Sequence, residues 1–241
     1  MNDSLISSIC GRYQRALAQI AEAAAGSGRA AEAVQLVVVS KSQPLEVVRA
    51  AIAAGVSIFG ENYAEEAVEK IAALKDTAVE WHMIGHVQSR KANLVAEHFT
   101  MLHSLDSLKL AGRLDRFCGE LKRRLPVLLE FNVSGEESKS GFPAWEDPRW
   151  PDLLADVEKI LAFSHLRVRG LMTMPPFFDD PERTRPYFQK LRRLQEFLVK
   201  RFPQVDWSEL SMGTSADFLA AVQEGATFVR IGQAILGPRS K

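Results

Sequence analysis

Lys41 directly follows a strongly apolar stretch, where a lysine could support covalent chemistry. Residues 36–39 are all apolar and three of them are β-branched, a composition typical of a strand buried on both faces. An ammonium group held among apolar neighbours is disfavoured relative to the neutral amine, and a neutral amine is a nucleophile toward carbonyl groups. The stretch therefore indicates a Schiff-base lysine. Taken alone, it also allows a lysine that extends into solvent from the strand end.

Two glycine-bearing segments near the end of the chain predict a phosphate site. Residues 211–217 and 230–233 each place small or hydroxyl-bearing residues between an apolar strand and a following helix, where free backbone amides favour an anion. The candidate phosphate-binding residues are Ser211, Gly213, Thr214, Ser215, Gly232 and Gln233. The alternative for the first segment is an ordinary capped turn with Ser215 as the N-cap.

A carbonyl-reactive lysine and a phosphate site together suggest a ligand that carries both an aldehyde and a phosphate, and pyridoxal 5′-phosphate (PLP) does. Arg230 would then lie near the ring nitrogen of that ligand. Because an arginine keeps its proton near neutral pH, it would donate a hydrogen bond and leave the ring unprotonated. An unprotonated ring is a weak electron sink, which favours holding the aldehyde or exchanging a proton. The alternative for Arg230 is a salt bridge to a carboxylate such as Glu61.

These residues meet only if the fold brings the strand ends together, and the chain alternates predicted strands and helices throughout. The predicted strands lie at 36–39, 57–60, 81–85, 100–103, 126–133, 166–172, 207–211 and 227–230. The predicted helices lie at 4–25, 45–54, 61–74, 89–98, 106–123, 181–202, 215–224 and 232–236, and Asp106 is the predicted cap of the helix at 106–123. One more helix follows a polar loop at 134–148 and ends near residue 163. This order is typical of an α/β protein with a parallel sheet.

Eight strand–helix units in strict order favour a single (β/α)₈ TIM barrel over residues 1–241, with an extra N-terminal helix. A doubly wound open sheet is the alternative, but it would usually carry a glycine-rich fingerprint after its first strand, where this chain has Ser40 and Lys41. In a barrel the residues that follow the strands collect at one rim. They would be Lys41, Asn62, His86 or Gln88, His103, 132–134, 172–174, 211–215 and 230–232.

Several short motifs in these same places resemble the pyridoxal phosphate homeostasis protein family, the small single-barrel relatives of the alanine racemase N-terminal domain. The matching motifs are VVVSK at 37–41, FGENY at 59–63, WHMIG at 81–85, SKSG at 138–141, RGLM at 169–172, LSMG at 210–213 and VRIG at 229–232, continuing through Gly237. Two positions depart from the pattern. Arg90 stands where the family usually has asparagine, and Thr214 stands where methionine is common.

The resemblance implies a barrel of the alanine racemase N-terminal type with PLP bound as an internal aldimine to Lys41. It implies that the phosphate lies against 211–215 and 232–233, that Arg230 lies near the ring nitrogen and that Asn62 lies beside the cofactor. It further implies a carrier or regulator in intracellular PLP homeostasis, without robust turnover, that meets PLP-dependent apoenzymes transiently.

Three other functions remain alternatives. A PLP-dependent amino-acid racemase needs a second proton-transfer group, which resembling racemases supply as a tyrosine from a further C-terminal domain. Because the sequence stops at Lys241, we expect no such domain, and Tyr63 is the nearest rim tyrosine. A cofactor-free Schiff-base aldolase would use His103 or His86 as its acid–base partner. A docking barrel would rest on the basic residues at 90–91 and 122–124, which are more typical of a solvated surface.

The overall composition excludes several classes of protein. Lysine and arginine equal aspartate and glutamate at 30 each, so no general nucleic-acid or anionic-membrane surface is expected. The two cysteines, Cys10 and Cys118, have no metal-ligand or disulfide spacing and are interpreted as helix-packing thiols. No signal peptide or membrane-length apolar run is recognised. We therefore expect a cytoplasmic protein that binds no metal. We also expect a monomer, although no sequence pattern indicates the number of subunits.

Overall fold

The computed structural model describes residues 3–238 and has a ring of parallel strands at its centre. The strands are β1 (Gln35–Val39), β2 (Ile58–Glu61), β3 (Glu80–Met83), β4 (Met101–Leu105), β5 (Leu125–Asn132), β7 (Leu166–Met172), β8 (Glu209–Thr214) and β9 (Phe228–Ile231). Each pairs in parallel with its neighbours, β9 pairs with β1, and the β4–β5 pairing closes the ring. This confirms the predicted eight-stranded barrel, and the open-sheet alternative is wrong.

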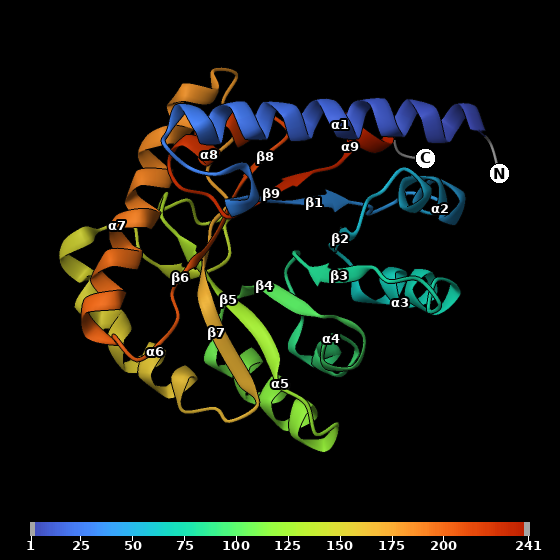
Figure 1. Ribbon diagram of the computed structural model, residues 1–241. Coiled ribbons are helices and arrows are strands. Elements are labelled where there is room, and N and C mark those ends of the chain that lie inside the picture. The colour runs from blue at the N-terminus through green and yellow to red at the C-terminus, as the bar shows by residue number, and fades with distance from the viewer. Residues whose placement is uncertain (1–2, 239–241) are drawn as a thin grey trace.

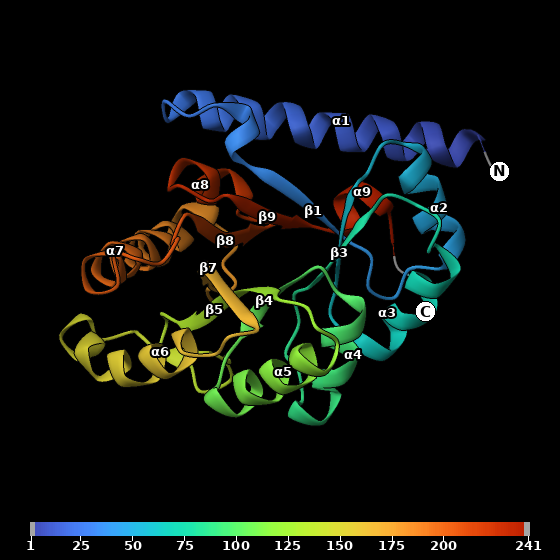
Figure 2. The ribbon, with the colours of Figure 1, turned by 60° about the horizontal axis from the view of Figure 1, so that its bottom comes forward.

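Helices cover the outside of the ring (Figures 1 and 2). They are α1 (Asp3–Gly26), α2 (Leu45–Ala53), α3 (Ala64–Ala73), α4 (Ala92–His98), α5 (Leu108–Glu120), α6 (Leu154–Leu161), α7 (Arg185–Arg201), α8 (Phe218–Gln223) and α9 (Gln233–Leu236). Short 3₁₀ turns at 31–33, 89–91, 147–153 and 181–184 precede β1, α4, α6 and α7. A two-residue strand, β6 (Phe142–Pro143), adds to β5 within the predicted polar loop.

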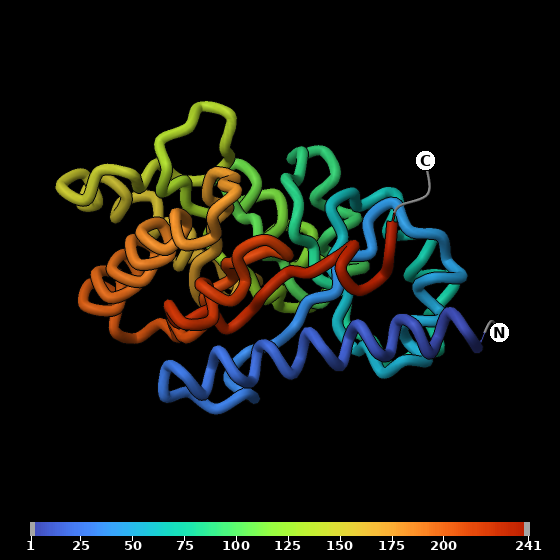
Figure 3. The backbone as a smooth tube through the Cα atoms, turned by 90° about the horizontal axis from the view of Figure 1, so that it is seen from above, coloured from blue at the N-terminus to red at the C-terminus, as the bar shows by residue number. Residues whose placement is uncertain are grey.

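The predicted N-terminal helix is present as α1, which lies along one side of the barrel (Figure 3). Ile9, Ala16 and Ile20 recur at helical spacing and are buried. The side chain of Arg12 donates a hydrogen bond of 2.6 Å to the carbonyl of Ile235, which ties α1 to α9. Within residues 3–238, no helix has the length and apolar character needed to cross a membrane.

Some element boundaries differ from the prediction. Asp106 does not cap α5; Ser107 does, by accepting a hydrogen bond from the Leu110 amide, while Asp106 binds the ring of His86 at 2.7 Å. Strand β8 ends at Thr214 rather than at residue 211, so α8 begins later than predicted and Asp217, not Ser215, is its N-cap.

The barrel interior holds an apolar cluster with a polar chain beside it. Val37, Ile84, Met101, Leu128, Met172 and Phe228 form the apolar cluster. His82, His103, Ser211 and Arg230 are buried polar residues from β3, β4, β8 and β9. The interior is therefore packed rather than open, and the space for a ligand lies above it at the carboxyl ends of the strands.

Candidate functional site

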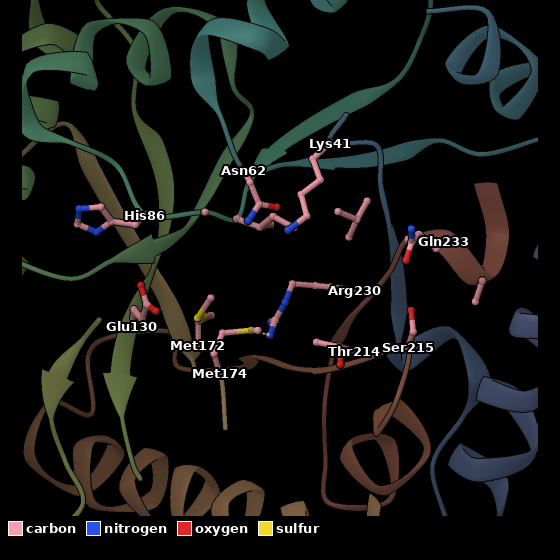
Figure 4. A pocket seen from close by; sticks show the side chains of 15 residues that line it. Lys41, Asn62, His86, Glu130, Met172, Met174, Thr214, Ser215, Arg230 and Gln233 are labelled. Carbon is pink, nitrogen blue, oxygen red and sulfur yellow. Dashed lines mark hydrogen bonds between the residues drawn. The ribbon is translucent and has the colours of Figure 1, made fainter. Parts of the chain in front are cut away.

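A cavity of about 350 Å³ lies at the carboxyl ends of the strands (Figure 4). Its walls come from the ends of β1, β5, β7, β8 and β9 and from the segments that follow β1, β2, β3, β7, β8 and β9. Seven of the nine predicted site residues line it: Lys41, Asn62, Thr214, Ser215, Arg230, Gly232 and Gln233. The predicted rim therefore does gather chemically capable side chains around one space.

Lys41 stands in the turn after β1 and is half-buried. Its side chain points into the cavity toward Arg230, and Asn62 lies beside it in Figure 4. The alternative of a lysine extending away from the barrel into solvent is therefore wrong. An amine in this place can reach a carbonyl group of a ligand held in the cavity.

Arg230 lies on the floor of the cavity and is only 4% exposed. Its guanidinium donates to Ser211 Oγ at 2.5 Å, to the Thr173 carbonyl at 3.1 Å and to Met174 Sδ at 2.8 Å. Burial lowers the pKa of Arg230 to about 10, against the opposing effect of nearby carboxylates. The group remains a cationic donor at neutral pH. The salt bridge to Glu61 is not formed, because Glu61 pairs with Lys70 at 2.9 Å instead.

The two predicted anion-binding segments form one wall of the cavity. Thr214, Ser215 and Gln233 lie together on the far side of Arg230 from Glu130 and His86 (Figure 4). Gly232 runs so close to β1 that a Cβ there would lie 3.2 Å from the Val39 carbonyl oxygen. The backbone amide of Thr214 donates to Asp217 Oδ1 at 2.6 Å and its hydroxyl donates to the same oxygen at 3.0 Å. Both hydrogen-bond donors of Thr214 are therefore directed at Asp217.

Ser211 and Gly213 do not line the cavity, in contrast to the prediction. Ser211 is fully buried in β8 below it, where its hydroxyl accepts the hydrogen bond from Arg230. Gly213 has φ +91°, and a Cβ there would lie 2.5 Å from Cβ of Ala221. Glycine at this position thus lets α8 pack closely behind the wall. Both residues support the site without contacting its space.

A chain of hydrogen bonds runs from Arg230 through the barrel interior. Ser211 accepts from Arg230 and lies 2.8 Å from His103 Nδ1. His103 Nε2 lies 3.0 Å from His82 Nδ1, and His82 Nε2 lies 3.3 Å from the carboxylate of Glu80.

The donors of this chain can be assigned in order, because a guanidinium only donates and a carboxylate only accepts. The Ser211 hydroxyl donates a hydrogen bond to His103 Nδ1. His103 Nε2 then donates to His82 Nδ1, and His82 Nε2 donates to the carboxylate of Glu80. Burial, with the nearby His82 and Arg230, holds the pKa of His103 well below 6.5, so its imidazole is neutral. His103 was predicted at the rim as an acid–base candidate; it is fully buried and serves the interior chain instead.

Glu130 is the functional candidate that sequence reasoning missed. It is 6% exposed, lies in β5 and faces the cavity. Burial, with repulsion from Asp106, raises its pKa to about 7, and among the described residues its Oε2 atom has no hydrogen-bond partner. The available signal was an acidic residue inside the apolar run 127–131, since buried charges are rare without a partner or a role.

The comparisons with known proteins agree with this geometry. The family model described as the alanine racemase N-terminal domain matches residues 16–240. The pyridoxal phosphate homeostasis protein of Vibrio alginolyticus is 44% identical over 217 residues, which cover 88% of this chain and 89% of that protein. The chain belongs to the pyridoxal phosphate homeostasis protein family. The family member from Aquifex aeolicus is 38% identical over 95% of this chain and 98% of its own length.

A solved structure of a similar protein shows the same fold with PLP bound. PipY of Synechococcus elongatus has a TM-score of 0.78 and 37% identity, covering 90% of this chain and 100% of PipY. The alanine racemase of Streptomyces lavendulae is 16% identical to this chain, with a TM-score of 0.70, and this similarity shows a common fold only. The predicted family and its barrel are therefore confirmed.

Proposed function

We propose that this protein binds PLP through a Schiff base to Lys41 and holds it as a carrier or regulator in intracellular PLP homeostasis. The observation that carries the proposal is that the Lys41 side chain points into a cavity whose floor is the buried Arg230. The similarity to pyridoxal phosphate homeostasis proteins and to the PLP-bound PipY structure supports the same function.

The side chains present fit this cofactor. PLP supplies an aldehyde that condenses with an amine, and Lys41 is the amine that points into the cavity. Ser215 and Gln233 offer a hydroxyl and an amide donor on one wall for the phosphate, whereas the two donors of Thr214 beside them are directed at Asp217. At about 350 Å³, the cavity lies within the usual size range of small-ligand sites.

Arg230 gives the site its chemical character. As a cation held by three acceptors it can donate toward the ring nitrogen, and it gives up no proton at neutral pH. A ring left unprotonated stabilises a neighbouring carbanion poorly. This supports a role in holding the aldehyde rather than one in sustained turnover.

Racemisation is the second candidate, since the fold is shared with alanine racemases. It needs a second proton-transfer group on the side of the substrate opposite Lys41. Tyr63 is 59% exposed and borders a neighbouring cavity with Glu65 and Lys91 rather than the space that Lys41 enters. His86 does border that space, but it is paired with Asp106 at 2.7 Å.

We propose that the protein works as a cytoplasmic monomer that passes PLP to apoenzymes through transient contacts.

The test is a titration of the protein with PLP. We expect a Lys41-dependent absorbance band of the imine in the wild-type protein and none in Lys41→Ala. We also expect negligible interconversion of L- and D-alanine. Sustained racemisation by the wild-type protein would assign it to the racemases, and a colourless protein that traps a sugar-like substrate on borohydride treatment would assign it to the aldolases.

A further inference from the structure

A buried ion cluster lies behind the turn that carries Lys41, outside the lining of the cavity. Lys70 of α3 is 7% exposed, and its ammonium donates to Glu61 Oε1 at 2.9 Å and to Glu66 Oε1 at 2.6 Å. Its third bond, of 2.8 Å, goes to the backbone carbonyl of Ser40. An ammonium has three protons to donate, so each has an acceptor in this cluster.

The cluster holds the residue that precedes Lys41. Besides the bond from Lys70 to its carbonyl, Ser40 donates its hydroxyl to Glu61 Oε1 at 2.7 Å. Ser40 and Glu61 are both fully buried. Hydrogen bonds between buried charged and polar groups fix geometry strongly, because breaking one leaves a charge without a partner.

The same cluster holds the residue that follows Lys41. The amide of Ser42 donates to Glu66 Oε1 at 2.7 Å, and this is the oxygen that also accepts from Lys70. Ser42 has φ +55°, in the left-handed region that residues with a side chain seldom adopt. Within the turn, the amide of Gln43 donates to the carbonyl of Ser40 at 3.1 Å, and Glu66 adds a contact from outside the turn that favours this conformation of Ser42.

We propose that Lys70, acting through Glu66 and Ser40, is a positioning residue that keeps Lys41 directed into the cavity. The inference rests on the proposed role of Lys41 as the cofactor-binding amine. Lys41 lies between two backbone groups that one ammonium and its carboxylate partners hold in place. If the cluster is disrupted, the turn can relax, and the amine no longer meets the aldehyde in the required direction.

The experiment compares the rate of imine formation after PLP is mixed with the protein. Glu66→Ala removes the acceptor of the Ser42 amide at a side chain that is 31% exposed, so it is expected to fold. Lys70→Met removes the ammonium. A displacement of the reacting group by about 1 Å can cost up to about a hundredfold in rate, and we expect both variants to be slower by roughly tenfold to a hundredfold. Glu66→Gln, which retains an acceptor, should recover most of the loss.

Arg123→Met is the matched control. Arg123 also donates to backbone carbonyls of a connecting segment, those of Ala96, Glu97 and Phe99, but at the opposite end of the barrel. Its loss should lower the thermal midpoint without slowing imine formation.

Folded Glu66→Ala protein with the wild-type rate would overturn the inference, as would equal slowing in Glu66→Gln and Glu66→Ala. If Lys70→Met does not fold, the pair at position 66 still decides the matter. In all these cases a wild-type band that depends on Lys41 keeps the proposed function, whereas its absence would remove both.

Discussion

The carboxyl group of Glu130 is buried at the wall of the cavity, and this burial should make the stability of the protein depend on pH. Burial raises its pKa from 4.5 to about 7. The folded protein therefore binds this proton more tightly than the unfolded chain does. Since the pKa is raised, the stabilising contribution is complete below pH 4.5 and is lost as the pH rises through 7.

Glu130→Gln replaces the carboxyl group by an amide of nearly the same shape that cannot ionise. A pKa shift of this size corresponds to roughly 3 kcal/mol. Part of this stabilising contribution is already lost at about pH 5. Between about pH 5 and about pH 8.5, we therefore expect the wild type to lose roughly 2 to 3 kcal/mol of unfolding free energy relative to Glu130→Gln.

The assay is urea denaturation at both pH values, with each protein in a Lys41→Ala background so that no cofactor is attached. The quantity compared is the change with pH, which removes the constant effect of the amide. Glu137→Gln, at an exposed position in the loop after β5, controls for the loss of a surface charge. Parallel pH profiles for wild type and Glu130→Gln would refute the reasoning and show that Glu130 is ionised without cost.

Two further predictions concern the barrel wall and the barrel interior. Gly213→Ala should lower the free energy of unfolding by about 2 kcal/mol or more, because alanine is strained at a left-handed φ and would crowd Ala221. Gly11→Ala, which has open space around it, should instead stabilise α1 by about 1 kcal/mol. Equal effects of the two substitutions in urea denaturation would contradict this prediction. His103 should remain neutral with its proton on Nε2, so its ring ¹⁵N shifts should stay constant from about pH 8 to about pH 5. Because its pKa is lowered, its contribution to stability is lost as the pH falls below about 6.5. A change of these shifts near that pH would contradict the assigned series of hydrogen bonds.

The barrel could be predicted because each strand is a short apolar run followed by a polar rim residue and a helical pattern. Lys41, Asn62 and Arg230 were assigned to the rim from their places just after or at the ends of such runs, and the structure brings them to one cavity. The parallel topology is sufficient for this prediction, because it places the carboxyl ends of all the strands on the same side of the barrel.

The remaining features depend on where each strand ends and which way its side chains face. His103 was expected at the rim, but β4 continues to Leu105, which leaves His103 inside the barrel. The inward direction of Glu130 cannot be predicted from the sequence, because a strand buried on both faces lacks the alternation of apolar and polar residues that would distinguish its two faces. The strand β8 also continues past Ser211, through Met212 and Gly213, so that Ser211 supports Arg230 from below.

The central claim is that Lys41 is the amine to which PLP is attached. The most direct measurement is reduction of the PLP-loaded protein with borohydride, followed by digestion and mass spectrometry of the peptides. The account predicts one phosphopyridoxyl group on the peptide that contains Lys41 in the wild-type protein. It predicts none on the corresponding peptide of Lys41→Ala, in which Arg230 and the rest of the cavity are unchanged. Stoichiometric modification of another lysine, with Lys41 unmodified in the wild-type protein, would contradict it.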